Sequence, residues 1–476
     1  MLDLKSTDKR VQWNLSTMLK RYILAPVLML FLITSTGADD GWQAGVAKQN
    51  ITPDEPMWMA GYGSRDRPSQ GKLTDLWAKA LVLQDASGNQ AVLITLDLVG
   101  IDRELATAIT DQIQTVHQLD RSQIAICCSH THTGPALKKN LAPLHYLIVD
   151  KDQQQKIAAY EERLQQQILV AVGDAFAKRQ SAKLSWGSGT ASFATNRREN
   201  RPEGKVAQWR SEGKLKGPVD HDVPVLAVAD PQGKLVSVVF GYACHATVLG
   251  VYSWSGDYPG FACAALEESY PDSIAMFWAG CGADQNPLPR RTVELARHYG
   301  RRLATAVETV LMTIQMQQLA PTLSSRFREI DLPLGPLPSR EQIEANARSK
   351  NKWEAARATM LLEQLDRGET LAQTYPYAVG SWTLGDDIDM VFLGGEVVVD
   401  YALRLKSELR GKQSWIAGYA NDVMAYIPSR RVLQEGGYEG GTSMVYYGLP
   451  AHWSPEVERH IVDEVHRQMD ESTRGE

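Results

Sequence analysis

The stretch Ile124-Ala-Ile-Cys-Cys-Ser-His-Thr-His-Thr-Gly-Pro135 is a short apolar run that ends in two histidines and a Gly-Pro turn. The apolar run predicts a buried strand. His130 and His132 stand two residues apart, so their imidazoles point to the same side if the strand continues, which would not happen on a helix. A strand end that delivers two imidazoles into a turn is a common start of a metal site. The alternative is that one or both histidines cap the strand through hydrogen bonds.

A third histidine has a similar setting. His245 ends the apolar run Leu235-Val-Ser-Val-Val-Phe-Gly-Tyr-Ala-Cys244 and is followed by Ala-Thr, in a chain with only ten histidines. Two histidine-bearing strand ends that lie far apart in the sequence can meet only through the fold, as the ligands of catalytic metals commonly do. We therefore expect His245 to join His130.

The composition is that of an ordinary globular protein. The 476 residues are 43% hydrophobic and 22% charged, with a net charge of -6, and give room for a large core. The lack of a basic surplus argues against nucleic acid as a partner. Helical and strand-like patterns alternate without a repeat or a low-complexity linker. This predicts the α/β class, with a single large mixed α/β domain.

Periodicity predicts helices and strands along most of the chain. Helices are expected at Glu104–His117, Asp150–Lys178, Pro259–Glu268, 290–315, 339–366 and 397–409. Strands are expected at Trp77–Leu83, Ala91–Leu96, 183–188, 223–229, 235–241, Ile274–Trp278, 380–393 and 413–418. The helix at 339–366 has the character of a surface insertion, and the chain ends in a polar, Gly-rich tail.

The first 38 residues have the pattern of an export signal. Met18-Leu-Lys-Arg precedes the apolar run Tyr22–Ile33 and the small residues Thr36-Gly-Ala38. The apolar run is shorter than the ~20 residues of a membrane span. We predict a signal peptide at 1–38, a mature catalytic domain at 39–476 and an exported, periplasmic or secreted, protein; a retained membrane anchor is the alternative. The five cysteines, odd in number and without a C-x-x-C pair, predict small buried side chains and no disulfide framework.

A series of motifs resembles the neutral/alkaline non-lysosomal ceramidases, zinc amidases that cleave the N-acyl bond of ceramide. The motifs follow the order of the family across about 44–450. They are Ala44-Gly-Val-Ala-Lys, Asn50-Ile-Thr-Pro53, Ala60-Gly-Tyr62, His130-Thr-His-Thr-Gly-Pro135, Ala243-Cys-His-Ala-Thr247, Gly280–Pro287, Gly394-Gly-Glu396, Asn421–Ile427 and Tyr438-Glu-Gly440. No single short motif could produce such an ordered series by chance.

The resemblance implies a Zn²⁺ site held by His130, His245, Glu396 and Tyr426. Two imidazoles, a carboxylate and a phenolate form a chemically sound zinc set with space for water. The apolar flanks of Glu396 argue against a solvated charge, whereas packing within a strand is the alternative for Tyr426. Zinc lowers the pKa of a bound water to about 7, so the implied reaction is attack of this water on an amide carbonyl.

The resemblance also implies roles for four other residues. Tyr438 would steady the oxyanion, and His132 would donate a hydrogen bond or shuttle a proton beside the metal. Arg197 would face the substrate, with a surface salt bridge as the alternative. Asn286 stands where the family has a serine with an assigned catalytic part. A serine nucleophile is therefore excluded at that point.

Two departures from the family leave the substrate open. One is Asn286; the other is that the family continues into a C-terminal β-sandwich domain, whereas this chain stops soon after the last motif. We expect a ceramidase-like hydrolase of a small-molecule or lipid-like acyl amide, with an ester, a lactone or another amide as the alternative substrate. Peripheral membrane contact stays open, and no obligate protein partner is inferred. A non-catalytic exported metal-binding protein is the alternative of another class; its metal would be closed by four protein ligands and buried.

Overall fold

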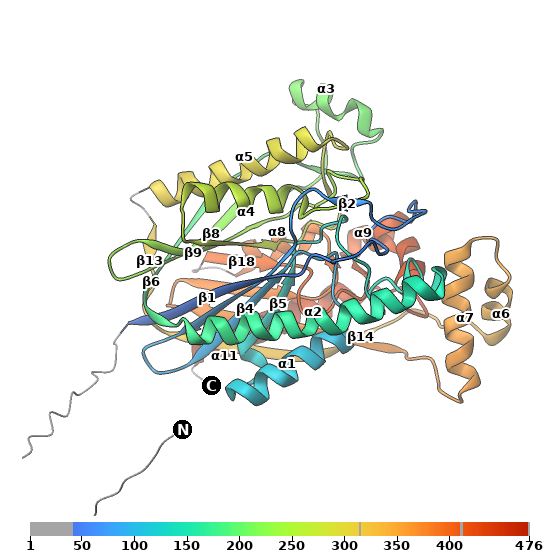
Figure 1. Cartoon of the computed structure of the whole chain (residues 1–476). Coiled ribbons are helices and arrows are strands. Elements are labelled where there is room, and N and C mark those ends of the chain that lie inside the picture. Colours follow the sequence, from blue (N-terminus) through green and yellow to red (C-terminus); the bar gives the residue numbers. More distant parts are fainter. Residues whose placement is uncertain (1–40, 314–315, 410–412, 475–476) are drawn as a thin grey trace, which may run out of the picture. The chain divides into compact units, whose positions relative to one another are not determined.

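The computed structural model describes residues 41–313, 316–409 and 413–474 (Figure 1). The predicted signal peptide at 1–38 lies outside the described residues. From residue 41 onward the chain forms one compact unit. No helix among the described residues is long and apolar enough to span a membrane.

The larger of the two main sheets carries both histidine motifs. Its nine strands are β1 (Trp42–Asn50), β3 (Trp77–Gln84), β4 (Gln90–Leu96), β5 (Ile124–Cys128), β6 (Gln180–Thr190), β8 (Asp222–Ala229), β9 (Leu235–Tyr242), β11 (Ile274–Ala279) and β13 (Gln317–Gln318). They are ordered β11-β9-β8-β6-β1-β3-β4-β5, with β13 paired to β6. Neighbours run antiparallel except β11 with β9 and β4 with β5, which are parallel.

The second main sheet packs against one face of the first. It consists of β14 (Leu323–Pro333), β15 (Thr374–Leu384), β16 (Ile388–Leu393) and β18 (Gln413–Ala417), in that order. Between the sheets lies an apolar core that includes five tryptophans, Trp42, Trp186, Trp278, Trp382 and Trp415. Alternation along β3 follows from the two-residue period of a strand: Leu81 faces this core, and Ala80 and Val82 face the opposite side.

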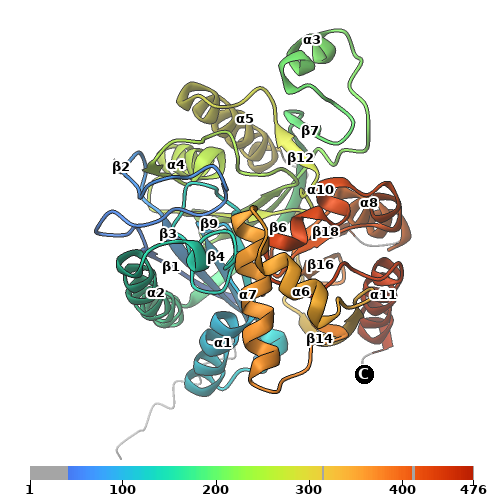
Figure 2. The same cartoon turned by 90° about the vertical axis from the view of Figure 1, so that its right-hand side faces the viewer.

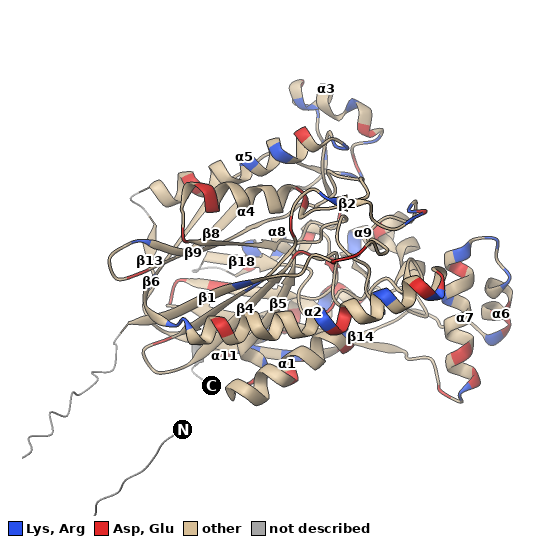
Figure 3. Cartoon of the chain, in the orientation of Figure 1, with Lys and Arg blue, Asp and Glu red and all other residues tan. Residues whose placement is uncertain are grey.

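Helices cover the outer faces of both sheets (Figures 1 and 2). The apolar faces of α1 (Arg103–His117), α2 (Lys151–Ala177), α4 (Asp257–Ser269) and α5 (Val293–Met312) share a core with the larger sheet. Those of α8 (Val399–Glu408) and α11 (Val457–Arg474) share one with the second sheet. Charged side chains gather on helices such as α2 and are few on the strands (Figure 3). The resulting α/β/β/α layering confirms the predicted mixed α/β class.

Three regions differ from the sequence-based expectation. The helix predicted at 339–366 is two helices, α6 (Arg340–Ala347) and α7 (Lys352–Asp366), because Asn351 caps the start of the second through the backbone N–H groups of Trp353 and Glu354. Strand β14 was not predicted. The tail is largely helical, with α9 (Arg430–Glu435), α10 (Gly437–Gly440) and α11; α11 buries Val457, Ile461 and Val465 at helical spacing. The prediction for the cysteines is confirmed, since all five are buried and free.

Several short elements complete the chain. One is a short helix, α3 (Val206–Ser211). Three short strand pairs hold loops together: β2 (Gly71–Lys72) with β10 (Ser253–Trp254), β7 (Ala194–Asn196) with β12 (Gln285–Pro287), and β17 (Glu396–Val397) with β19 (Tyr426–Ile427). The end of β18 and the segment after it reach both edges of the larger sheet: Ala420 bridges to Cys127 of β5, and Ala417 bridges to Gly280, directly after β11. This segment therefore brings the ends of β5 and β11 to one place.

Candidate metal centre and active site

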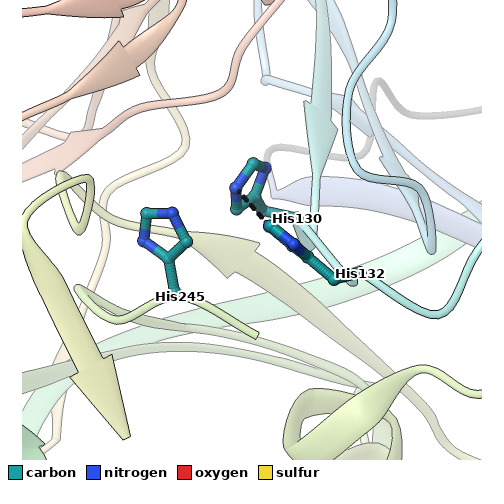
Figure 4. Close-up of side chains that lie close together, drawn as sticks. All are labelled: His130, His132 and His245. Atoms are coloured by element: carbon teal, nitrogen blue, oxygen red, sulfur yellow. Dashed lines mark hydrogen bonds between the residues drawn. The ribbon is translucent and has the colours of Figure 1, made fainter. Parts of the chain in front are cut away.

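The two histidine motifs meet directly beyond the ends of β5 and β9. Strand β5 ends at Cys128, and His130 has a left-handed φ of +58°, so the strand does not continue through the histidines as the simplest pattern suggested. A turn brings the imidazoles together instead, and Thr131 forms a parallel bridge with Ala246, beside His245. Figure 4 shows the three rings of His130, His132 and His245 facing one another. One ring nitrogen of each lies within 4.8 Å of the others.

Glu396 and Tyr426 reach the same point from the C-terminal part of the chain. They are Cα partners in the parallel pair of β17 with β19, which places both side chains on one side. Glu396 Oε2 lies 3.3 Å from His130 Nε2 and 3.2 Å from His245 Nε2. The Tyr426 hydroxyl lies 3.3 Å from His245 Nε2. The structure thus brings all four expected metal ligands together.

Hydrogen bonds to the backbone set the tautomers of two of these histidines. His130 Nδ1 lies 2.5 Å from the carbonyl of Val99, and His245 Nδ1 lies 2.8 Å from that of Gly282. Because a carbonyl only accepts, each Nδ1 carries a proton and each Nε2 turns its lone pair to the centre. Burial, together with the charge of Arg197, lowers the pKa of His245 to about 4, so its imidazole is neutral at pH 7.

This arrangement fits a cation. The two lone pairs face Glu396 Oε2, which is buried and accepts no hydrogen bond from the described residues. Its other oxygen, Glu396 Oε1, accepts from the Tyr447 hydroxyl, which fits a carboxylate. Several acceptors therefore converge without a proton to share, and imidazole, carboxylate and phenol are ligands that zinc takes.

His132 lies as close to the centre as the four expected ligands. Its Nε2 is 3.1 Å from His130 Nε2, and its Nδ1 is buried without a hydrogen-bond partner among the described residues. Burial holds its pKa well below the usual value. The geometry therefore suits a neutral imidazole beside a metal, and the ring is near enough to serve as a further ligand.

Arg197 extends from the end of β7 into the same space. Its side chain is 14% exposed and pairs with Glu439, with Arg197 Nε 2.7 Å from Glu439 Oε1. One terminal nitrogen donates to the Tyr426 hydroxyl at 3.1 Å, and the other donates to Asn286 Oδ1 at 3.4 Å. Burial alone would lower the pKa of Arg197, but Tyr426 and Glu439 raise it well above the usual value. Arg197 is thus part of the site and not a surface salt bridge.

The centre opens into a cavity of about 720 Å³. His132, Tyr426, Asn286 and Arg197 line it together with Tyr438. Tyr438 is 39% exposed, and its ring centroid lies 5.2 Å from that of Tyr426. A structural metal would be sealed by protein on all sides, so a cavity beside the ligands favours a catalytic centre.

Comparisons with known proteins agree with this architecture. The family model for the N-terminal region of neutral/alkaline non-lysosomal ceramidases matches residues 42–279, half of the chain. The chain belongs to the neutral/alkaline non-lysosomal ceramidase family. The match ends at the last residue of β11, so it includes both histidine motifs but neither Glu396 nor Tyr426.

Curated relatives and solved structures of this family resemble the chain at low identity. A neutral ceramidase of Pseudomonas aeruginosa is 23% identical over 231 residues, which are 47% of this chain and 33% of the relative. A neutral ceramidase of Drosophila pseudoobscura is 23% identical over 262 residues, which are 52% of this chain and 36% of the relative. The matches thus span about a third of these relatives. The crystal structure of the Pseudomonas aeruginosa protein has a TM-score of 0.67 at 20% identity, covering 88% of this chain and 72% of that one. A ceramidase complexed with C2 has a TM-score of 0.69 at 17% identity, and the match covers 90% of this chain and 76% of that one. Both show a shared fold.

Sequence reasoning missed three residues of this ceramidase-family site. The Tyr447 hydroxyl donates to Glu396 Oε1, opposite the oxygen that faces the histidines. The Tyr419 ring lies 4.3 Å from the ring of His130. Glu439, next to Tyr438, is 1% exposed and holds Arg197. Of these three residues, only Glu439 had a sequence signal, because it lies inside the Tyr438-Glu-Gly440 motif. Tyr447 and Tyr419 stand in no motif that would mark them as part of a site.

Proposed function

We propose that this ceramidase-family protein is a zinc-dependent hydrolase that cleaves the amide bond of a ceramide-like N-acyl amide. The observation that carries the proposal is the convergence of His130, His245, Glu396 and Tyr426 at the edge of a cavity, with two imidazole lone pairs and a carboxylate oxygen turned to one point. Family membership supports the reaction class.

These four residues would hold the metal. A bound zinc supplies a Lewis acid for the amide carbonyl and lowers the pKa of its water to about 7. Tyr447 and the backbone carbonyls of Val99 and Gly282 keep the ligands in their orientations through hydrogen bonds.

The remaining side chains of the site act on the substrate. The Arg197 cation lies beside Tyr426, where it stabilises negative charge on the phenolate and on the carbonyl oxygen during attack. Tyr438 presents its hydroxyl at the cavity as a second donor to that oxygen. His132, a neutral imidazole next to His130, can accept a proton. Asn286 orients Arg197 and offers no nucleophile.

Three substitutions test the proposal. His130→Ala removes a ligand, so we expect metal content and amide hydrolysis to be lost together. Asn286→Ala should retain the metal and lower the rate only through weaker positioning of Arg197. Tyr438→Phe should retain the metal and lower kcat by about 10²–10³, the cost of one oxyanion donor.

The measurements are elemental analysis of the purified protein and hydrolysis of matched N-acyl amides and acyl esters, with and without a chelator. Full activity in metal-free protein would contradict the proposal, and so would an acyl group trapped on a side chain. Preference for the ester would change the reaction class while leaving the metal centre intact.

We also propose that the protein is exported. Support comes from the basic Met18-Leu-Lys-Arg segment, the apolar run after it and the small residues before Asp39. Mass spectrometry of the periplasmic or secreted protein should find Asp39 at the N-terminus. An intact Met1 or Met18 on membrane-bound protein would show that the segment is an anchor.

A further inference from the structure

The wall of the active-site cavity is rich in arginine. Four arginines line it, Arg197, Arg201, Arg290 and Arg291, against two carboxylates, Glu203 and Glu439. The whole chain, by contrast, has a net charge of -6. A cavity with charge of one sign and walls of low dielectric concentrates ligands of the opposite sign.

Two of the four arginines have their charges used inside the protein. Arg197 pairs with Glu439, which also accepts from Arg198. Arg290 pairs with Glu203 at 2.7 Å. Neither is free to bind a charged ligand without giving up its partner.

Arg201 and Arg291 are different. Within residues 41–313, 316–409 and 413–474, neither guanidinium has a carboxylate at ion-pair distance, and both residues are exposed. Arg201 uses one nitrogen to donate to the carbonyl of Arg197. Arg291 senses the charge of buried Asp257 only from beyond ion-pair range. The two carboxylates of the lining, Glu439 and Glu203, already pair with Arg197 and Arg290.

The backbone holds Arg291 in an unfavourable conformation at this position. Its φ is +92°, in the left-handed region that side chains other than glycine rarely adopt, and its N–H donates to the carbonyl of Val248 at 2.6 Å. Such a conformation persists where the surrounding structure requires it, commonly at a ligand site. Its carbon Cζ lies 4.8 Å from the ring centroid of Tyr62, and that ring lies 4.8 Å from the ring of His132. One aromatic ring thus separates the guanidinium from the candidate metal centre.

We propose that the substrate carries an anionic group on the amine side of the scissile amide, recognised by Arg291 and Arg201. This rests on the proposed amide hydrolysis. Because the acyl part of a lipid-like amide is apolar, a charged wall fits the amine part. Guanidinium groups bind carboxylate, sulfonate and phosphate oxygens through paired N–H donors. Because one aromatic ring separates Arg291 from His132, we expect the anion on the part of the amine that is near the amide nitrogen.

A series of amides with one acyl chain tests this. N-dodecanoylglycine carries a carboxylate, N-dodecanoyltaurine a sulfonate and N-dodecanoylethanolamine phosphate a phosphate; N-dodecanoylethanolamine is the neutral member. We expect kcat/KM for at least one anion to exceed that of the neutral amide about tenfold or more. The anion with the largest ratio identifies the head group. The ratio should fall with added salt, since exposed guanidinium groups are screened.

Variants locate the effect. Arg291→Gln, and more strongly Arg201→Gln with Arg291→Gln, should lower the anionic-to-neutral ratio about tenfold, and Arg291→Lys should restore part of it. Arg301→Gln is the matched control, because Arg301 is an exposed arginine of α5 that lines a different cavity, beside Ser192 and Thr305. Its ratio should equal that of the wild type.

The outcomes separate this inference from the proposed function. Hydrolysis of the neutral amide with an anionic-to-neutral ratio near one overturns the head-group assignment and leaves the hydrolase standing. A ratio that is unchanged in the Arg291 variants overturns it as well. If no amide is hydrolysed, the proposed function fails, and calorimetry of the same amides on the intact protein decides the head group: binding of an anion weakened by Arg291→Gln supports it, and equal binding of all four overturns it.

Discussion

Gly61 is the residue that allows His132 to lie beside the candidate metal centre. Its φ is +92°, and a Cβ built on it would lie 2.4 Å from His132 Cγ. No L side chain fits this space without moving the imidazole. A small residue in the Ala60-Gly-Tyr62 motif thus has a specific steric cause.

We expect Gly61→Ala to lower the rate of amide hydrolysis at least tenfold, because a displaced His132 no longer meets its proton-transfer geometry. Gly233→Ala is the matched control: Gly233 has a φ of +91° and nothing within 4 Å of its added Cβ. Both variants should lose about 1 kcal/mol of stability from backbone strain. Steady-state kinetics and thermal denaturation provide the comparison, and equal activities of the two variants would contradict a steric role for Gly61.

The hairpin of α6 and α7 acts at the scale of elements, as a clamp on the segment that carries Tyr447. It has only a small core of its own, Ile343, Ala358 and Leu361. Arg357 of α7 donates to the carbonyls of Leu449 and Pro450, each at 2.8 Å, directly after the segment that carries Tyr447. The sequence marked this region as an insertion on the surface, but its contacts reach the segment next to Tyr447, which orients Glu396.

Arg357→Ala should loosen the chain at 446–450 and weaken metal binding through Tyr447. Positioning of a metal ligand by a neighbouring hydrogen bond is worth about 10–100-fold in metal affinity, and we expect a loss at the lower end of that range. Hydrogen exchange of the segment and metal competition titrations measure the two effects. Arg348→Ala, at the exposed end of α6, is the control and should change neither. Faster exchange without a change in affinity would show that the clamp does not reach the metal.

At the scale of the whole molecule, a buried carboxyl group ties stability to pH. Asp422 is 4% exposed and accepts from the Tyr375 hydroxyl at 2.5 Å. Burial raises its pKa to about 7. The unfolded chain loses this proton near pH 4, so above that pH it holds fewer protons than the folded protein. The folded state is then penalised increasingly as pH rises from about 4 to about 7, and no further above that.

The free energy of unfolding of the wild type, relative to that of Asp422→Asn, should therefore fall by about 2–3 kcal/mol between pH 5 and pH 8. The asparagine keeps an acceptor for Tyr375 and has no titration, so it removes the pH-dependent part. Urea denaturation of both proteins at the two pH values gives the difference. A difference that stays constant with pH would mean that Asp422 is not protonated in the folded protein at pH 5.

The sequence by itself determined the class of fold and the residues of the candidate centre. The spacing of apolar residues differs between strands and helices and shows which face of each element is buried. This spacing is a local property of the chain. The spacing of His130 and His132, and the motifs around His245, Glu396 and Tyr426, marked the residues that the structure brings together. Helix α11 was not predicted, although its apolar period is present in the sequence.

Only the tertiary structure decided the surroundings of the centre. The left-handed turn at His130 replaces the strand that alternation suggested, and its imidazole is set by the carbonyl of Val99, a partner on another loop. The hydrogen bond from Tyr447 to Glu396, and the approach of Arg291 to the cavity of His132, join segments that are distant in sequence. Such contacts depend on how the layers pack, and a single chain read in order carries no local signal for them.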